Sequence, residues 1–193
     1  MLPQEIAPPQ TDESPVIIET HDLSRIYPGV VALDNVNYRV YRNKVNVLIG
    51  ENGAGKSTMM KMLAGVETPS SGKIILDGKE VTLNSTHQAE KHGISIIFQE
   101  LNLFPNMNVM DNIFMANEFF QKGKINEKYQ YELAKSLLER LELNVDPYTQ
   151  LGELGIGHQQ LVEIARALSK DTRVLIMDEP TSALSQSEVK VLF

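Results

Sequence analysis

The chain has 193 residues, 42% of them hydrophobic, which is enough to bury one core with a small appended subdomain. Eighteen basic and 25 acidic side chains give a formal net charge of -7, which disfavours nucleic acid or an anionic lipid surface as the main partner. The lack of cysteine excludes disulfides and thiolate metal sites, and no apolar run reaches the roughly 20 residues that span a bilayer. We therefore expect a globular protein of the cytoplasm.

The front third of the chain is rich in strand patterns. Residues 1–15, rich in proline, glutamine and acidic residues, are expected to be a flexible tail without the features of a secretory signal. Folded structure should begin near Val16. Turn signals such as Pro28-Gly29 and Asp77-Gly78 separate four predicted strands, at residues 16–23, 31–41, 44–50 and 72–78.

Helical patterns dominate after Thr86. One more buried strand is predicted at residues 92–99, and residues 112–143 then show a helical period, with Leu133, Leu137 and Leu141 on one face. We expect a helical subdomain at about residues 100–170 within one domain that covers residues 16–193. The last predicted elements are a helix that contains Leu161, Ile164, Ala165 and Leu168, a strand at residues 173–177, and a helix opened by the capping box of Ser185 and Glu188.

The segment "VNVLIGENGAGKSTMM" (residues 45–60) contains a phosphate-binding pattern. Residues 50–57 fit G-x-x-x-x-G-K-[ST], between a predicted strand at 45–49 and a predicted helix from Ser57. Glycines let successive backbone N–H groups point inward, and the helix N-terminus adds partial positive charge. Lys56 would reach the β- and γ-phosphates, and the Ser57 hydroxyl would coordinate Mg²⁺. The alternative is an ordinary glycine-rich turn with a solvated lysine.

The segment "RVLIMDEP" supplies the acidic residues that a phosphate loop requires. Asp178 follows an apolar strand and is suited to the Mg²⁺ shell, and Glu179 is suited to polarising an attacking water. Together they indicate hydrolysis. By itself such a pair would be explained by two solvated acidic residues at a strand end.

The segment "LGELGIGHQQLVEIARALS" is a glycine-containing turn followed by an amphipathic helix. With Lys56, Gln99, Asp178 and Glu179, it resembles the nucleotide-binding domain of ABC transporters over residues 16–193. More narrowly, "YPGVVALDNV", "FQELNLFPNMNVMDNIFM" and "HQQLVEIARALSKDTRVLIMDEPTSAL" resemble the ATPase subunits of ribose, xylose and galactoside importers. The resemblance implies an α/β P-loop NTPase of ABC type, with a mixed β core, a parallel sheet around the P-loop helix, and an α-helical subdomain.

The resemblance also implies roles for single residues. Tyr27 would stack on adenine, and Gln99 would contact Mg²⁺ and face the membrane subunit. Lys56, Gln99 and Glu179 are the expected catalytic residues, and Ser57, Gln99 and Asp178 the expected metal ligands. The expected nucleotide-binding residues are Tyr27, Gly50, Glu51, Asn52, Gly53, Ala54, Gly55, Lys56, Ser57, Thr58 and Asp178. The signature turn, which would contact ATP held by a partner domain, is Leu154, Gly155, Ile156, Gly157 and His158.

The sequence departs from the family pattern in the signature and at its end. The usual Leu-Ser-Gly-Gly-Gln is replaced by residues 154–158, so the serine hydroxyl expected at position 155 is absent. The switch histidine expected some tens of residues after the acidic pair does not occur before Phe193. We expect the chain alone to bind ATP without appreciable hydrolysis.

The function implied by the resemblance is an ATPase, with ATP and Mg²⁺ as cofactors, that energises import of a monosaccharide or related polyol. Its implied partners are membrane permease subunits, a second nucleotide-binding domain in a homodimer or tandem and, indirectly, a periplasmic sugar-binding protein. Its implied location is the cytoplasmic face of the inner membrane. Two alternatives stay open: a non-catalytic ATP-binding fragment of a split gene, and a soluble ABC protein that acts on ribosomes or DNA.

Overall fold

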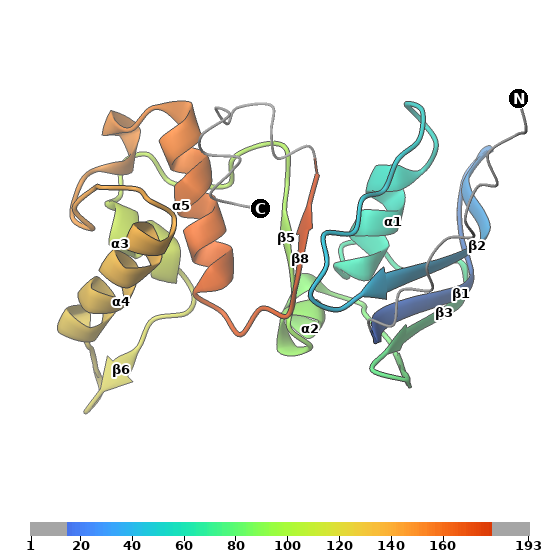
Figure 1. Cartoon of the computed structure of the whole chain (residues 1–193), viewed down its shortest axis with the longest axis horizontal. Coiled ribbons are helices and arrows are strands. Elements are labelled where there is room, and N and C mark those ends of the chain that lie inside the picture. Colours follow the sequence, from blue (N-terminus) through green and yellow to red (C-terminus); the bar gives the residue numbers. More distant parts are fainter. Residues whose placement is uncertain (1–14, 179–193) are drawn as a thin grey trace, which may run out of the picture. The chain divides into compact units, whose positions relative to one another are not determined.

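The computed structural model describes residues 15–178, which fall into two units (Figure 1). Of the described residues, unit 1 comprises 15–54 and 69–82, and unit 2 comprises 55–68 and 83–178. Glu179, the helix expected from Ser185 and nearly all of the expected tail lie outside the described residues. The two units are described separately below.

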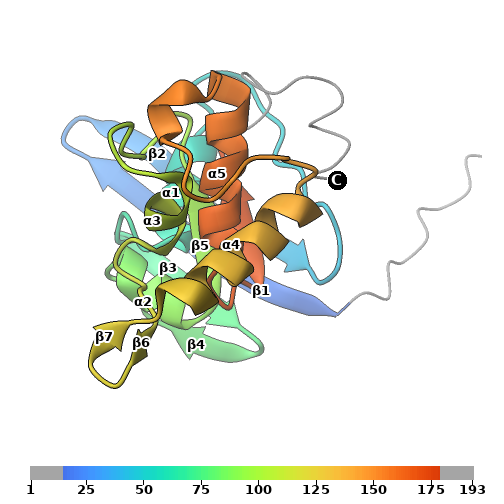
Figure 2. The ribbon, with the colours of Figure 1, turned by 90° about the vertical axis from the view of Figure 1, so that its left-hand side faces the viewer.

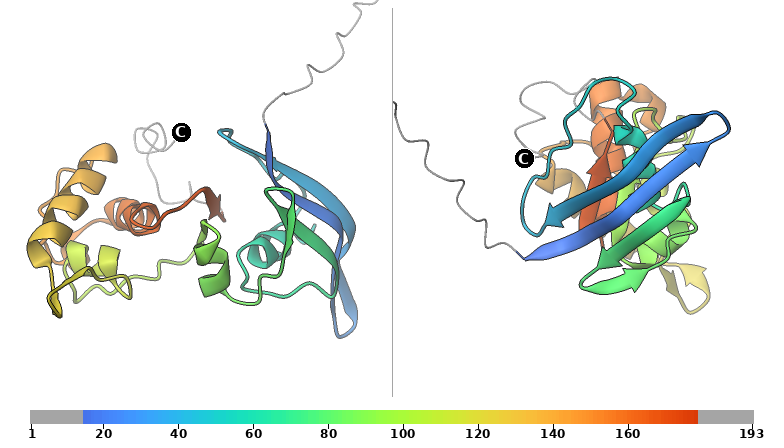
Figure 3. Two further views of the ribbon diagram at one scale, coloured as in Figure 1. Left: turned by 90° about the horizontal axis from the view of Figure 1, so that it is seen from below. Right: turned by 90° about the vertical axis from the view of Figure 1, so that its right-hand side faces the viewer.

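Unit 1 is a four-stranded antiparallel sheet with the order β2-β1-β3-β4. Figure 3 shows β1 between β2 and β3. The buried side chains of Ile18, Leu23, Ile74 and Leu76 form its apolar face. Three of the four predicted strands are thereby confirmed. The strands are β1 (Val16–Tyr27), β2 (Val30–Tyr41), β3 (Ser71–Leu76) and β4 (Lys79–Val81).

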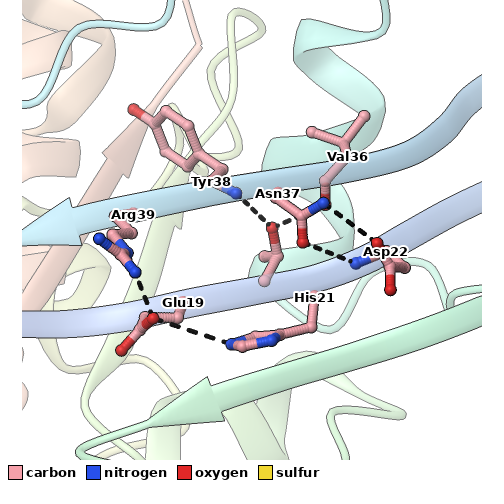
Figure 4. Close-up of polar contacts among 8 residues, drawn as sticks. Glu19, His21, Asp22, Val36, Asn37, Tyr38 and Arg39 are labelled. Carbon is pink, nitrogen blue, oxygen red and sulfur yellow. Dashed lines mark hydrogen bonds and ion pairs between the residues drawn. The ribbon is translucent and has the colours of Figure 1, made fainter.

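Polar side chains on the exposed face of β1 and β2 follow the alternation of the strands (Figure 4). Glu19 accepts a hydrogen bond from Arg39 Nε at 3.3 Å and lies 3.7 Å from His21 Nε2. Between these positions, the buried Thr20 hydroxyl donates to the Val36 carbonyl at 3.1 Å. The ladder between β1 and β2 is thus reinforced by side chains on both faces.

The strand predicted at residues 44–50 is not formed, and this prediction is wrong. Val45, Val47 and Ile49 are 63%, 67% and 87% exposed, and residues 45–50 have no regular secondary structure. Asn46 instead folds back and donates from Nδ2 to the Tyr41 carbonyl at 2.9 Å. An apolar run becomes a strand only where a neighbour supplies ladder hydrogen bonds, and the run alone does not reveal that neighbour.

Unit 2 contains the parallel strand pair β5 (Ile94–Ile97) and β8 (Val174–Met177). Both strands were predicted, as was the helix α1 (Lys56–Leu63). The helix α2 (Thr86–Lys91) was not predicted. Its N-cap is Ser85, whose side chain accepts a hydrogen bond from the Gln88 N–H.

The remaining elements of unit 2 are mostly helical (Figure 2). Phe114, Leu137, Leu138 and Ile164 belong to the core that joins α3, α4 and α5, and each is at most 4% exposed. The elements are α3 (Val109–Phe114), β6 (Phe120–Gln121), β7 (Lys124–Ile125), α4 (Glu127–Arg140), the 3₁₀ turn η1 (Leu151–Glu153) and α5 (Ile156–Leu168).

The helical pattern predicted for residues 112–143 is interrupted, so the prediction is wrong for residues 115–126. The β6–β7 hairpin occupies part of this stretch. Ala116, Lys122 and Gly123 have φ values of 61°, 51° and 77°, which lie outside the right-handed helical region. The periodicity of the sequence depends on which side chains are apolar. It contains no information about these left-handed backbone conformations.

Candidate functional site

The predicted phosphate loop, residues 50–58, contains a boundary between the units in sequence, since Ala54 belongs to unit 1 and Gly55 to unit 2. Gly53 and Gly55 have φ values of 84° and 87°, in the left-handed region that favours glycine. Nothing lies within 4 Å of the position that a Gly53 Cβ would take. Glycine is therefore favoured at position 53 by the backbone conformation and not by a lack of space for a side chain. The glycine spacing therefore matches the backbone shape of the loop.

The N-terminus of α1 presents positive potential. The helix begins at Lys56 with Gly55 as its N-cap, and no side chain among the described residues caps it. Its first turn contains no acidic residue. Because the first N–H groups of a helix have no partner within that helix, this terminus suits an anion such as a phosphate group.

Ser57 and Asp178 are brought together across 121 positions of sequence. The Ser57 hydroxyl donates to Asp178 Oδ1 at 3.4 Å. Asp178 follows β8, and its backbone N–H donates to the Ile97 carbonyl at 3.1 Å, which fixes it at the carboxyl end of the β5–β8 pair. Two oxygen ligands at this spacing suit a hard cation such as Mg²⁺.

Gln99 lies two residues beyond β5, on the edge of the strand pair from which Asp178 also emerges. Because the carboxyl ends of parallel strands meet at one edge, the pairing carries both residues toward the same side. The Gln99 side chain is exposed. The end of β5 that precedes Gln99 is thus paired with the end of β8 that precedes Asp178.

Tyr27 ends β1 in unit 1, at the turn into β2. The Arg25 guanidinium carbon lies 4.7 Å from the centre of the Tyr27 ring, a cation–π contact. The structure therefore brings Ser57 and Asp178 together within unit 2, while Tyr27 belongs to unit 1.

The signature turn, residues 154–158, lies between η1 and α5. Gly155 is the N-cap of α5 with φ −63° and ψ 157°, an ordinary extended conformation. Gln159 Nε2 donates to the Leu154 carbonyl at 2.8 Å and holds the turn, while Ile156 is 65% exposed. The turn thus offers the N–H groups of a helix N-terminus, beside an exposed apolar side chain.

Glu163 was not identified from the sequence. It is 7% exposed on α5, and its Oε1 accepts a hydrogen bond from the Asn102 N–H at 3.3 Å. Arg166 Nη1 donates to the Asn102 carbonyl at 3.0 Å, so two residues of α5 hold a segment three residues beyond Gln99. Burial raises the pKa of Glu163, while the Asn102 hydrogen bond and the Arg166 charge lower it in part. The sequence signal was a carboxylate inside the apolar run "LVEIARAL".

The described part of the chain, residues 15–178, contains no helix that is both long and apolar enough to cross a bilayer. It also contains no group of three or more histidine, cysteine, aspartate or glutamate side chains placed to hold a metal ion.

Comparison with known proteins identifies similar sequences and folds. A family model described as "ABC transporter" matches residues 33–182. The chain is 48% identical over 179 residues to a putative ribose/galactose/methyl galactoside import ATP-binding protein of Halalkalibacterium halodurans, covering 92% of this chain and 34% of that protein. It is 49% identical over 181 residues to a xylose import ATP-binding protein of Thermoanaerobacter pseudethanolicus, covering 93% and 36%. The chain thus spans about a third of the length of these relatives.

Two solved structures match most of the chain. An ATP-binding cassette of an ABC transporter matches with a TM-score of 0.80 and 27% identity, over 93% of this chain and 75% of that one. A part of an ABC transporter complex from Clostridium perfringens matches with a TM-score of 0.76 and 29% identity, over 93% and 73%.

Proposed function

The chain belongs to the ABC transporter family, and from this premise we propose that it binds Mg-ATP and couples its hydrolysis to the import of a monosaccharide or related polyol through a membrane permease. The sugar class is supported by the ribose, galactoside and xylose import proteins that the chain resembles. The observation that carries the nucleotide part is the contact between Ser57 Oγ and Asp178 Oδ1.

The phosphate end of ATP would be held by the loop and by α1. The N–H groups at the start of α1 would donate to phosphate oxygens, and Lys56 would neutralise the β- and γ-phosphates. The left-handed Gly53 and Gly55 support this role because they bend the backbone that precedes the helix.

Ser57, Gln99 and Asp178 would hold Mg²⁺. When bound, Mg²⁺ would supply positive charge that stabilises the negative charge of the phosphate groups. Ser57 and Asp178 orient each other through their hydrogen bond, and the backbone N–H of Asp178 keeps that carboxylate at the strand end. Glu179, which lies outside the described residues, would accept the proton of the attacking water.

Adenine would stack on Tyr27. The Arg25 guanidinium covers one side of the ring, so a base would use the opposite side. Stacking of a base on an aromatic ring is worth about 1–3 kcal/mol and requires the ring rather than the hydroxyl.

The signature turn would meet ATP held by a second nucleotide-binding domain. With glycine at position 155, the backbone N–H groups at the start of α5 would be its donors to the γ-phosphate. The partner domain and the permease would place the protein at the cytoplasmic face of the membrane, with a sugar-binding protein delivering substrate from the other side.

The nucleotide site is tested by calorimetric titration of the 193-residue chain with ATP, with and without Mg²⁺. We expect Lys56→Ala to weaken binding in both conditions, because a charge-assisted hydrogen bond is worth about 1.5–3 kcal/mol, roughly 10- to 150-fold. Asp178→Asn should weaken binding only with Mg²⁺. Lys61→Ala, in the last turn of the same helix, is the matched control and should bind as the parent does. Unchanged affinity in Lys56→Ala would refute the phosphate site.

The substrate class is tested separately. Bacterial mutants that lack the ATP-binding subunit of ribose or xylose import should regain growth on the sugar when they express the protein that carries this chain. Failure on both sugars, with ATP binding intact, would contradict the sugar class and leave the nucleotide site standing.

A further inference from the structure

Gln99, a predicted ligand of Mg²⁺, lies on a segment without regular secondary structure that is attached at both ends. At its start, the Asp178 N–H donates to the Ile97 carbonyl at the end of β5, at 3.1 Å. At its far end, α5 holds Asn102, and the course of the chain from β5 can be followed in Figure 1. Only residues 98–101 separate the two attachments. The position of Asn102 therefore limits where Gln99 can lie.

Asn102 is held through both polar groups of its backbone. Its N–H donates to Glu163 Oε1 at 3.3 Å, and its carbonyl accepts a hydrogen bond from Arg166 Nη1 at 3.0 Å. Glu163 and Arg166 lie three positions apart on α5, so both project from the same side of that helix. A carboxyl group thus meets the N–H and a guanidinium meets the carbonyl. We call these two contacts the Asn102 clamp.

The burial of Glu163 is not explained by the stability of the core around it. The residue is 7% exposed, and its Oε2 has no hydrogen-bond partner among the described residues. Burying an unpaired carboxyl oxygen destabilises a fold, and a leucine at this position would avoid that cost. Its neighbours Val162 and Ile164 are apolar residues of the core. The contact with Asn102 is therefore what the carboxyl group contributes and an apolar side chain could not.

We propose that Glu163 is a positioning residue for the magnesium site. With Arg166 it holds Asn102, and through residues 98–101 it keeps Gln99 at the carboxyl edge of the β5–β8 pair. Its effect passes through the backbone, because the residue that it fixes is Asn102. This inference rests on the proposed function, since it takes Gln99 as a ligand of Mg²⁺. It extends that function by giving a buried residue of α5 a role at the site.

The Asn102 clamp is tested without nucleotide, by amide hydrogen exchange of the 193-residue chain followed by NMR. Glu163→Leu should speed exchange of the Asn102 N–H about 10-fold, as expected for the loss of one hydrogen bond. It should not lower the midpoint of thermal unfolding, because it removes an unpaired buried oxygen. The matched control is Gln160→Leu, which replaces a buried polar side chain one turn earlier on α5 and should leave the Asn102 N–H unchanged.

The consequence for the metal is tested by calorimetric titration with ATP, with and without Mg²⁺. Glu163→Leu should weaken binding about 10-fold with Mg²⁺, at the lower end of the effects of residues that orient metal ligands, and should leave binding without Mg²⁺ unchanged. Glu163→Gln keeps an acceptor for the Asn102 N–H and should bind as the parent does. Added to Gln99→Ala, Glu163→Leu should cause no further loss, because both changes act through one ligand.

Several results would overturn this role. Unchanged exchange of the Asn102 N–H in Glu163→Leu would show that the contact does not hold the segment. Equal losses of ATP affinity with and without Mg²⁺, or losses that add to that of Gln99→Ala, would show a general structural role. A loss in Glu163→Gln as large as that in Glu163→Leu would contradict the part played by the acceptor.

The same titrations separate a failure of this role from a failure of the proposed function. If the parent chain binds ATP no better with Mg²⁺ than without it, the magnesium site itself is refuted, and the role of Glu163 is refuted with it. If Mg²⁺ strengthens binding in the parent and equally in Glu163→Leu, the magnesium site stands and the positioning role alone is refuted.

Discussion

Residues 45–58 and residues 154–178 carry the same kinds of sequence signal, and the structure treats them differently. Each segment has an apolar strand pattern and a helix, and each leads to predicted nucleotide-binding residues. In the first, Val47 is 67% exposed and no strand forms, whereas in the second, β8 pairs with β5 and Ile176 is 9% exposed. The difference shows that an apolar run indicates a segment that is stabilised by burial. A strand forms only if a neighbouring strand is also present to pair with it.

The helices of the two segments differ in the same sense. The helix α1 spans 8 residues, and only Met59, Met62 and Leu63 are buried. The helix α5 spans 13 residues and is buried on most sides, including the polar Gln160 and Glu163. The helix α1 is thus buried along one side, whereas α5 contributes Leu161, Val162, Ile164 and Ala165 to the core of unit 2.

The largest expected effect comes from matched truncations of the two apolar runs. Ile176→Ala should lower the free energy of unfolding by about 2–5 kcal/mol, because it removes a buried side chain and leaves a cavity. Val47→Ala should change it by less than about 0.5 kcal/mol, as expected for an exposed side chain. Urea unfolding of both variants, followed by far-UV circular dichroism, measures the contrast.

The comparison of Val47→Ala with Ile176→Ala tests whether residues 45–50 are unpaired and exposed. A loss of more than about 1 kcal/mol in Val47→Ala would show that this segment is paired and buried in solution. Similar losses for the two variants would remove the contrast between the segments. A small loss in Ile176→Ala would instead contradict the burial of β8.

The sequence predicted those elements whose pattern and pairing agree. The strands β1, β2, β3, β5 and β8 and the helices α1 and α5 were all expected, and the shared face of Leu133, Leu137 and Leu141 is confirmed by their packing on the core. The fold class was likewise predicted and is confirmed by the family match and the solved cassettes. The strand and helix predictions depend on local periodicity, which the sequence displays directly, whereas the fold class was implied by the resemblance to ABC transporter domains.

The features that were missed depend on partners or on backbone geometry. The segment at 44–50 lacks a described strand neighbour, and the hairpin after α3 follows from left-handed residues such as Ala116. Glu163 is significant only because the chain brings Asn102 to it, 61 positions away. Ser57 and Asp178 were each predicted as metal ligands from their own motifs, and the structure places Ser57 Oγ 3.4 Å from Asp178 Oδ1.

Glu163→Gln tests the effect of a buried carboxyl group in residues 154–178. Burial raises the pKa of Glu163 above its ordinary value of 4.5, so the folded state keeps its proton to a higher pH than the unfolded state does. Its contribution to stability is therefore full below pH 4.5 and is lost as the pH rises through the raised value. Unfolding free energies measured across this window should fall for the parent relative to Glu163→Gln.

The matched control for that profile is Glu153→Gln, which removes an exposed carboxylate from the neighbouring η1. The parent and Glu153→Gln should share the pH-dependent loss that Glu163→Gln lacks. Parallel profiles for all three proteins would contradict a raised pKa at Glu163. Glu163→Gln would instead lower the free energy of unfolding at every pH if the hydrogen bond from the Asn102 N–H to Glu163 were stronger than its length of 3.3 Å indicates.

The smallest expected effect is at Gly155, the N-cap of α5. Its φ and ψ of −63° and 157° suit any residue, and nothing lies within 4 Å of the position that a Cβ would take. Gly155→Ser should therefore stabilise the fold by a few tenths of a kcal/mol, because serine caps a helix slightly better than glycine. Gly152→Ser, three residues earlier, is the control: its Cβ would lie 3.1 Å from the Pro105 carbonyl oxygen, so it should destabilise. The midpoint of thermal unfolding measures both effects. If both variants lower this midpoint, the signature turn is packed more tightly around Gly155 than the structure indicates.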